Sequence, residues 1–570
     1  MSESRPLSGY AWMGLVVLAF LALVPGVTCA QSGIAGVARD TSSAVLPGVT
    51  VDAASPALIE RVRSVITDGE GAYKLLDLRP GLYTITFSLP GFRTVRRDGI
   101  ELPASFTATV SVELAVGSVE ETITVSGAAP QVDVQNVTSQ RVLSKDLLES
   151  IPAVRSPQGF TALTPGVIGA GIGSVPGGRE EMNTSGHGAV AAESVYLIDG
   201  MNTAEVQNAG GASTVFRISQ SYVSEINIVT GGGTAEQPFG GTVTNVIPKE
   251  GGNSFSGSIY TEYTGKNLQT NNLTDALKAQ GFTSDSVSGI VRLWDVSPAV
   301  GGRIFKDKLW FFSSYRDAGT IQTRAGLYEN LTPLGWVYTP DLSRPAVIKI
   351  TDGSRNTRLT WQATPKNKIG LFADFQPHIV HQRNYQFSVA PEATTYTPYL
   401  PNAFLTATWK SPATNRLLLE ASVAHDAVDF NLRRQPEIGF DVVSAVESTT
   451  ATMFRSSSSL LAGANNYGHF ANQSFRYAVS ASYITGSHAA KAGIQFLHGS
   501  EWFTEEANGD RAYLLRSGVP ISLTQYASPI RYENEVHADL GLFVQDQWTL
   551  KRLTLTGGLR YDYLNLGAAE

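Results

Sequence analysis

The side chains that most often do chemistry are scattered along this chain of 570 residues. Of its eight histidines only His378 and His381 are close, at a spacing that would place two metal ligands on one helical turn. Their neighbours are polar, which is typical of a loop after a strand. Adjacent carboxylates such as Glu180 and Glu181 would point to opposite sides of a strand. We therefore expect solvated faces there and no metal site.

The sequence also lacks the motifs that are typical of nucleophilic catalysis and of phosphate binding. Serine, histidine and aspartate are abundant, but no serine lies in a Gly-x-Ser-x-Gly turn between a strand and a helix. The glycine clusters at residues 169–173, 210–211 and 231–233 have neither the spacing of a dinucleotide fingerprint nor a following lysine. We predict no catalytic residues, no cofactor and no enzyme activity.

The single cysteine, Cys29, lies at the end of an export signal. Residues 1–30 carry Arg5, then an apolar stretch, then the small residues Thr28-Cys29-Ala30 of a cleavage site. Cleavage after Ala30 leaves no cysteine, so we expect no disulfide, no thiol catalysis and no Cys-ligated zinc. A short buried helix and lipidation of Cys29 are the alternatives, although Gly26 stands where lipidation would require leucine.

Composition excludes several classes of protein. Lys plus Arg is 43 against 50 for Asp plus Glu, a net charge of -7, which disfavours nucleic-acid binding. Charged residues are only 16% of the chain, and 55 glycines and 27 prolines favour turns over long helices. Beyond the N-terminus no apolar run approaches the roughly 18 residues of a membrane helix, which excludes helical membrane proteins but not barrels.

Two zones with short strands precede a third with longer ones. Residues 33–114 alternate β-rich runs with turn dipeptides such as Asp68-Gly69 and Pro80-Gly81, typical of a small sandwich. Alternate residues from Tyr83 to Leu89 are apolar, which predicts a strand with one buried face. Residues 127–250 are rich in glycine, with short apolar strands at 195–198 and 226–229.

From Phe255 to Tyr563 about eleven segments of roughly eight to twelve residues alternate apolar with polar, as membrane-barrel strands do. Apolar residues between Phe475 and Tyr483 share one face and oppose Arg476, which indicates an apolar exterior and a polar lumen. A soluble β-sandwich also alternates, so periodicity leaves both folds open. Tryptophans lie within or at the ends of such segments, where interfacial girdles occur, at Trp310, Trp361, Trp409 and Trp548.

Motifs in all three zones carry a resemblance to a known family. They occupy residues 33–37, 46–49, 67–73 and 78–83, then 151–152, 163–167, 195–200, 225–231 and 239–251, then 300–312, 542–548 and 558–563. Together these resemble TonB-dependent outer-membrane receptors of the Oar-like type, with an N-terminal carboxypeptidase-regulatory-like domain.

The resemblance implies a mainly β fold in five parts. These are a signal peptide (1–30), a transthyretin-like, carbohydrate-binding-like β-sandwich (31–117), a linker with a candidate TonB box (118–128), an α/β plug domain (129–252) and part of an antiparallel transmembrane β-barrel (253–570). Family barrels have about 22 strands and bacterial single-chain barrels an even number. We therefore expect a C-terminally truncated fragment whose barrel strands form an open, curved sheet around the plug. A complete barrel of ten or twelve strands is the alternative.

The resemblance also implies a function. The protein would lie in the outer membrane of a Gram-negative-type bacterium and import an extracellular ligand into the periplasm, using energy relayed by TonB and its inner-membrane complex. Its partners would be TonB, outer-membrane lipids and a ligand that is an oligosaccharide, a peptide or an iron chelate. The alternative is a structural or adhesive surface protein of the same architecture that transports nothing.

The only site residues that the resemblance implies are those that would bind TonB. Glu121, Thr122, Ile123, Thr124 and Val125 resemble a TonB box, a short β-prone segment that pairs by strand addition. The alternatives are the last strand of the sandwich or a linker. Ligand-binding residues stay unknown, although we expect aromatic residues in long loops, at Tyr385, Tyr396 and Tyr399.

Overall fold

The computed structural model describes most of the chain from Ser32 to Ala568. The residues outside the description are 1–31, 56–57, 59–60, 79–80, 103–106, 118–121, 127–138, 152–156, 162, 171–182, 187, 190–192, 207–215, 239, 271–272, 282–287, 384–388, 415, 461–465, 486–487, 551–552 and 569–570. The predicted signal peptide, Glu121, Glu180, Glu181 and Tyr385 therefore lie outside it.

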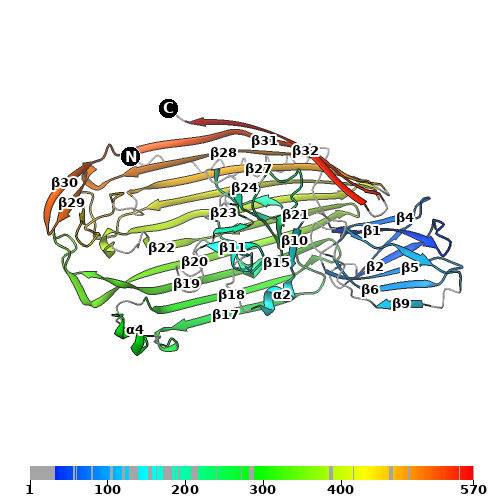
Figure 1. Cartoon of the computed structure of the whole chain (residues 1–570), viewed down its shortest axis with the longest axis horizontal. Helices are drawn as coiled ribbons and strands as arrows, with labels where there is room; N and C mark the ends of the chain where they lie inside the picture. The colour runs from blue at the N-terminus through cyan, green and yellow to red at the C-terminus, as the bar shows by residue number, and fades with distance from the viewer. Residues whose placement is uncertain are drawn as a thin grey trace.

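The N-terminal part is a β-sandwich of two sheets (Figure 1). One sheet has the order β4-β1-β7 with β8 also paired to β1, and the other has the order β3-β2-β5-β6-β9. The strands are β1 (Ser32–Asp40), β2 (Thr50–Ala54), β3 (Val62–Ile66), β4 (Ala72–Leu78), β5 (Gly81–Ser88), β6 (Thr94–Leu102), β7 (Thr107–Thr109), β8 (Val112–Leu114) and β9 (Thr122–Ser126).

The predicted alternation in β5 is confirmed, because Tyr83, Ile85 and Phe87 are all buried in the sandwich core. Tyr73 of β4 meets Phe87 edge-to-face, with ring centroids 5.5 Å apart. The turn before β4 is fastened by Asp68, whose carboxylate accepts from the N–H groups of residues 70 and 72. The two layers therefore enclose one apolar core.

The middle part is a five-stranded sheet of order β10-β15-β16-β13-β14, which we call the plug sheet. Its strands are β10 (Ser139–Leu143), β13 (Val195–Ile198), β14 (Met201–Asn202), β15 (Val223–Gly231) and β16 (Val243–Pro248), and α2 (Lys145–Ser150), α3 (Pro157–Thr161) and the hairpin of β11 (Val167–Ala170) with β12 (Asn183–Gly186) accompany it. Both predicted strands are present, as β13 and within β15. The turn between β13 and β14 is a tight one, because Asp199 and Gly200 both have positive φ, 50° and 82°.

The third part is a 12-stranded antiparallel sheet of order β17-β18-β19-β20-β21-β23-β24-β27-β28-β31-β32, with β22 paired to β20 and β23. Its strands are β17 (Ser256–Gly265), β18 (Ile290–Phe305), β19 (Leu309–Asn330), β20 (Pro340–Thr364), β21 (Asn367–Phe375), β22 (His378–Arg383), β23 (Thr395–Pro412), β24 (Leu417–Leu432), β27 (Tyr467–Ile484), β28 (His488–Glu506), β31 (Ile530–Leu550) and β32 (Leu553–Ala568).

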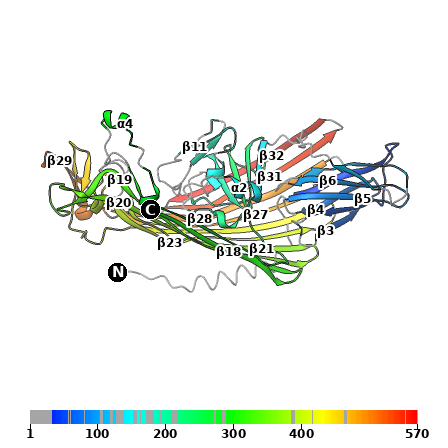
Figure 2. The same ribbon diagram turned by 90° about the horizontal axis from the view of Figure 1, so that it is seen from below.

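This sheet curves into a trough that holds the plug sheet (Figure 2). Within the described residues β17 pairs only with β18 and β32 only with β31, so the wall is open, as expected. The mainly β fold that the sequence predicted is confirmed. The described part of the chain has no helix long and apolar enough to cross a membrane.

All eleven predicted segments fall on strands, but apart from β17 and β21 these strands are longer than predicted. β20 has 25 residues and β19 has 22. At about 3.3 Å per residue β20 is roughly 80 Å long, well over the apolar band of about 25 Å that a barrel presents to lipid. Apolar and polar residues alternate only in the part of a strand that has one apolar face. The sequence therefore predicted that part of each strand and missed the rest.

Short turns join the strands at one end of the trough and long connections at the other. The short ones lie at residues 306–308, 365–366, 413–416, 485–487 and 551–552, and the long ones at 266–289, 331–339, 384–394, 433–466 and 507–529. The N-terminal sandwich lies at the short-turn end (Figure 1). We refer to the short-turn end and the long-loop end below.

Some of the long connections build a further sheet that the sequence did not predict. It has the order β26-β25-β29-β30 and lies at the long-loop end (Figure 1), and we call it the tip sheet. Its strands are β25 (Ser444–Glu447), β26 (Thr452–Phe454), β29 (Arg511–Arg516) and β30 (Val519–Gln525).

Two expected loop aromatics belong to a strand instead. Tyr396 and Tyr399 lie on β23, and Tyr399 is 4% exposed between His378 and the ring of Phe430. The predicted loop at His378 and His381 is likewise the strand β22. β22 pairs with β20 and β23, so both stretches lie within the large sheet although their sequences do not alternate apolar with polar residues.

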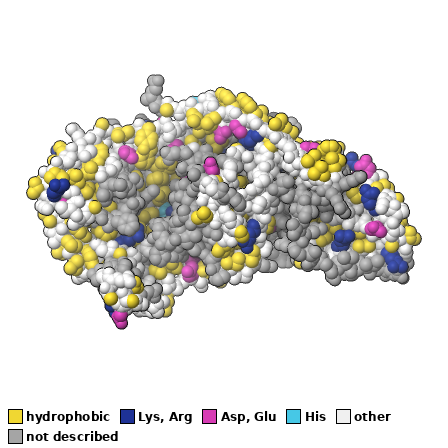
Figure 3. Space-filling view, in the orientation of Figure 1, with side chains coloured by type: hydrophobic (Ala, Val, Ile, Leu, Met, Phe, Trp, Pro, Cys, Tyr) yellow, Lys and Arg dark blue, Asp and Glu magenta, His cyan; other side chains and the backbone are white. Residues whose placement is uncertain are grey.

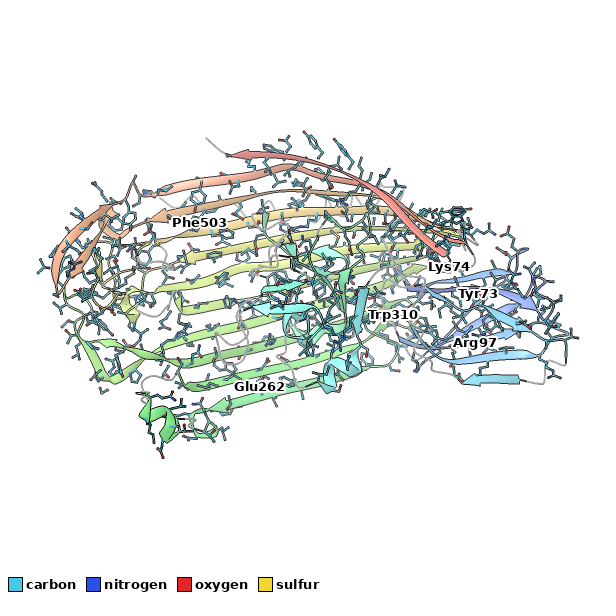
Figure 4. The ribbon with its side chains drawn as sticks, in the orientation of Figure 1. Tyr73, Lys74, Arg97, Glu262, Trp310 and Phe503 are labelled. Carbon is cyan, nitrogen blue, oxygen red and sulfur yellow. The ribbon has the colours of Figure 1, made fainter. Side chains whose placement is uncertain are left out.

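Three of the four tryptophans predicted for an interfacial girdle are at least partly accessible, and one is buried. Trp361 and Trp548 are 48% and 38% exposed, and Trp409 is partly buried beside Asn367 at the same end. Trp310 lies at the short-turn end, near the sandwich (Figure 4), but is 2% exposed and donates to Asn253 at 2.8 Å. It therefore points into the trough and not outward.

Candidate functional site

The plug sheet is packed on the concave face of the large sheet. Phe216 of the plug contacts Phe404 of β23 with ring centroids 5.3 Å apart, and Tyr222 contacts Phe372 of β21 at 5.1 Å. All four rings belong to one buried cluster. Phe312 of β19 and Ala424 of β24 belong to the same cluster, and polar contacts add to it.

The strongest polar contact is a group of four charges that we call the latch: Arg358, Asp199, Glu250 and Lys368. Arg358 of β20 donates to Asp199 in the β13–β14 turn and to Glu250 at the end of the plug, the latter at 3.1 Å. Lys368 of β21 lies 3.4 Å from Glu250. The Arg358 side chain is only 7% exposed, so this pairing takes place away from bulk water. One guanidinium thus joins the C-terminal ends of two neighbouring plug strands, β13 and β16, to the wall.

A second contact centres on Asp352 of β20. Its carboxylate lies 2.6 Å from Nδ1 of His378 and 3.8 Å from the guanidinium of plug residue Arg217. The Gln376 side chain accepts from the Arg217 N–H at 2.7 Å and donates to the Arg217 carbonyl. A single plug residue is therefore held by its side chain and by its backbone.

A third contact joins the plug to the strands late in the chain. Arg476 of β27 donates to the carbonyl of Ala204. Lys491 of β28 pairs with Glu236, and Arg560 of β32 donates to the carbonyl of the same glutamate at 3.1 Å. The plug is therefore tied to both halves of the wall, by groups that water could replace.

The histidine pair of the sequence does not form a metal site. His378 and His381 are three residues apart on β22, so their side chains point to opposite sides of the strand. His378 contacts Asp352 and Tyr399, whereas His381 packs against Tyr396 with centroids 5.4 Å apart. Across the described residues, no group of three or more His, Cys, Asp or Glu side chains could hold a metal ion.

The candidate TonB box forms the last strand of a sandwich sheet, which is one of the alternatives that the sequence left open. Thr122, Ile123, Thr124 and Val125 lie in β9, which pairs in parallel with β6 from Thr122 to Ser126. β9 is the last strand in its sheet, so its other edge faces away from the sandwich. The segment therefore has the extended backbone that strand addition requires.

The sandwich also contacts the large sheet directly, which sequence reasoning missed. Asp68 Oδ2 lies 2.6 Å from the guanidinium of Arg416 in a short turn, and Glu70 lies 3.7 Å from it. The hydrogen bond from Arg416 is the main cause that lowers the pKa of Asp68. The sequence marked Asp68 only as a turn residue, and no local signal pairs it with an arginine so distant in the chain.

Two family models match this chain. The carboxypeptidase regulatory-like domain matches residues 33–115, and the outer membrane beta barrel domain matches residues 344–567. The first covers the sandwich, and the second covers most of the large sheet together with the tip sheet. Both agree with the resemblance inferred from the motifs.

Similar proteins are found among curated sequences and solved structures. The chain is 30% identical over 320 residues to the TonB-dependent transporter Oar of Myxococcus xanthus, an alignment that covers 54% of this chain and 28% of that protein. It also resembles the crystal structure of the outer membrane transporter YddB from Escherichia coli, with a TM-score of 0.54 and 14% identity over 75% of this chain and 57% of the other. The chain thus matches under a third of its curated relative's length. The predicted resemblance to Oar-like TonB-dependent receptors is confirmed.

Proposed function

We propose that this chain acts as an outer-membrane TonB-dependent receptor that binds a ligand outside the cell and admits it to the periplasm. One observation carries the proposal: a separate small sheet fills the concave side of a large antiparallel sheet and is tied to it by ion pairs and hydrogen bonds as well as by one apolar cluster. A structural wall would gain more from an apolar core than from buried ion pairs. A plug that must move needs contacts that water can replace.

The convex side of the sheet supports a place in the membrane. Large apolar side chains are exposed along it, including Ile259, Ile494 and Leu559, and Trp361 and Trp548 lie near the short-turn end. Outer-membrane barrels have short periplasmic turns and longer extracellular loops. The sandwich and β9 would therefore face the periplasm, and the tip sheet would face outward.

Energy from TonB would enter through β9, which is extended and has one edge turned away from the sandwich. Strand addition depends on main-chain hydrogen bonds. Replacing Ile123 with proline removes a donor and fixes φ, so binding to the periplasmic domain of TonB should fall sharply. Ile123→Thr keeps the N–H and should bind as the native chain does. If the proline variant bound TonB as tightly as the native chain does, β9 would be a strand of the sandwich without a role in TonB binding.

Fractionation and uptake test the function as a whole. We expect the protein in the outer-membrane fraction, extractable only with detergent, and recovery as a soluble periplasmic protein would contradict the proposal. Cells would then be supplied with labelled oligosaccharides, peptides and iron chelates, with the native chain or Ile123→Pro. If cells with the native chain import one of these ligand classes and cells with Ile123→Pro do not, the result supports a transporter. Surface binding without import would assign the chain to the structural or adhesive alternative.

A further inference from the structure

Two carboxylates meet in the interface between the plug and the wall. Few charged side chains are visible on the face of the molecule that Figure 3 shows, whereas several are buried inside it. Most of those described above pair with the opposite charge, as Lys491 does with Glu236. Asp426 of β24 and Glu205, which follows β14 in the plug, are different, because both are acidic and they are 0% and 1% exposed. A buried carboxylate is costly unless a cation or a hydrogen-bond donor faces it.

The backbone on both sides of Glu205 is fixed to β27. Arg476 donates to the carbonyl of Ala204, the residue before Glu205. Asn472 accepts from the N–H of Val206, the residue after it, at 2.8 Å. Because two side chains of one strand hold the neighbours of Glu205, this stretch of the plug lies along the inner face of β27.

Asp426 lies beside the same stretch, on the neighbouring strand β24. Its partner in the ladder is Ser474, which lies between Asn472 and Arg476 on β27. The Asn472 side chain also donates to Oδ2 of Asp426 at 2.8 Å, so one amide contacts both the wall carboxylate and the plug backbone. The carboxylates of Asp426 and Glu205 are consequently close enough to repel each other.

The cation that faces both carboxylates is Arg476, and Asp539 of β31 faces it too. The terminal nitrogens of Arg476 donate to neutral oxygen atoms, one of them the hydroxyl of Ser474 at 2.7 Å. Oδ1 of Asp426 is buried and has no hydrogen-bond partner among the described residues. If both Asp426 and Glu205 were ionised, the interface would hold excess negative charge and an acceptor without a donor.

We propose that Glu205 and Asp426 share one proton while the plug is seated, so that a carboxyl–carboxylate hydrogen bond joins plug to wall and the pair carries one negative charge opposite Arg476. The proton gives Oδ1 of Asp426 a partner and removes the repulsion. When the plug opens, this hydrogen bond breaks, water reaches both groups, and the proton passes to water. Carboxyls in water bind protons only below roughly pH 4, so the seated plug holds one proton more than the open plug, and a rise in pH favours opening.

This inference rests on the proposed function only in treating the plug as a part that opens, and opening can be measured without a ligand. The readout is the urea midpoint at which a maleimide labels Ser194→Cys, a fully buried position, in the full chain with Cys29→Ser. Labelling is compared at about pH 5 and about pH 8, where carboxyls in water are mostly ionised.

Asp426→Asn and Glu205→Gln each replace one member of the pair by an amide, which donates a hydrogen bond as the protonated carboxyl does. In the native chain the opening equilibrium should rise at least about tenfold from about pH 5 to about pH 8, and in either variant it should change little. The matched control Glu236→Gln makes the same change at a plug carboxylate that faces Lys491. It should open more easily at both pH values and keep the native pH dependence.

Replacing both carboxylates distinguishes a shared proton from two ordinary ion pairs. The double variant leaves Arg476 facing Asp539 alone, so it should open more easily than either single variant. Single variants with the native pH dependence, or single variants that open more easily than the native chain at the higher pH, would overturn the proposal. Failure of ligand import with pH-dependent opening intact would refute transport alone and leave the shared proton standing.

Discussion

Replacing Arg358 with methionine should release the plug more easily. The change removes the guanidinium that meets both Asp199 and Glu250 and leaves a side chain of similar length. Losing one partner of a buried ion pair costs roughly 3–5 kcal/mol. Lys368 still lies 3.4 Å from Glu250, so only Asp199 loses its cation and we expect the lower end, about 3 kcal/mol. That is roughly a 100-fold shift of the equilibrium between seated and released plug.

A buried thiol on the plug reports this equilibrium. Ser194 is fully buried, so Ser194→Cys in a Cys29→Ser background gives one thiol that a maleimide reaches only when the plug opens. The urea midpoint of labelling should fall in Arg358→Met while the large sheet stays folded. Lys368→Met should lower the midpoint less, because Arg358 still meets both carboxylates. An unchanged midpoint in Arg358→Met, or a larger effect of Lys368→Met, would refute the assignment of the latch.

Two further predictions concern groups at opposite ends of the molecule. Arg416→Ala should loosen the contact between the sandwich and the short turns only slightly, because both partners are over a third exposed. The change would be seen as a broader distance distribution between spin labels on the two parts. Since the pKa of Asp68 is lowered, this contact is complete above its ordinary value of 3.8 and is lost only as pH falls through the lowered value, where the variant and native chains should converge. In the turn between β29 and β30 the Glu447 carboxylate accepts from the N–H groups of Ser517 and Gly518 at 3.0 and 2.9 Å. Glu447→Gln should reduce the hydrogen-exchange protection of Ser517 and Gly518, and unchanged protection would contradict the role given to this carboxylate. Hydrogen bonds from Gly518 and Thr449 lower the pKa of Glu447 to about 2, so the native turn should be fastened above pH 4.5 and loosen as pH approaches 2.

The sequence predicted best where one face of a strand packs against protein and the other face is exposed. From Phe475 to Tyr483 the alternation correctly assigned Arg476 to the inner side, where it meets the plug, and Tyr483 to the outer side. The same reasoning failed for Trp310, because a tryptophan at the end of a strand is equally compatible with both sides. Its burial depends on Asn253, which lies beyond the plug sheet.

The tip sheet could not be predicted, because its strands are short and their pairing is not local. β25 and β26 have four and three residues, too few for a period to show. β25 pairs in parallel with β29, more than sixty residues later, so no hairpin signal links them. The latch is hidden for a similar reason: a lone arginine in an alternating strand shows which side it faces but not which carboxylates it meets.

The order of elements along the chain determines how a pull on β9 would be carried. Residues 127–138 connect β9 to β10, and twelve residues reach at most about 40 Å when taut. Tension applied at β9 would load its pairing with β6 in the sandwich and, further along the chain, would arrive first at β10. That strand is at the margin of the plug sheet, and among the described strands it pairs with β15 alone, from Ser139 to Leu143. Mechanical failure of the plug would thus begin with one short strand, before the load reaches Asp199 and Glu250.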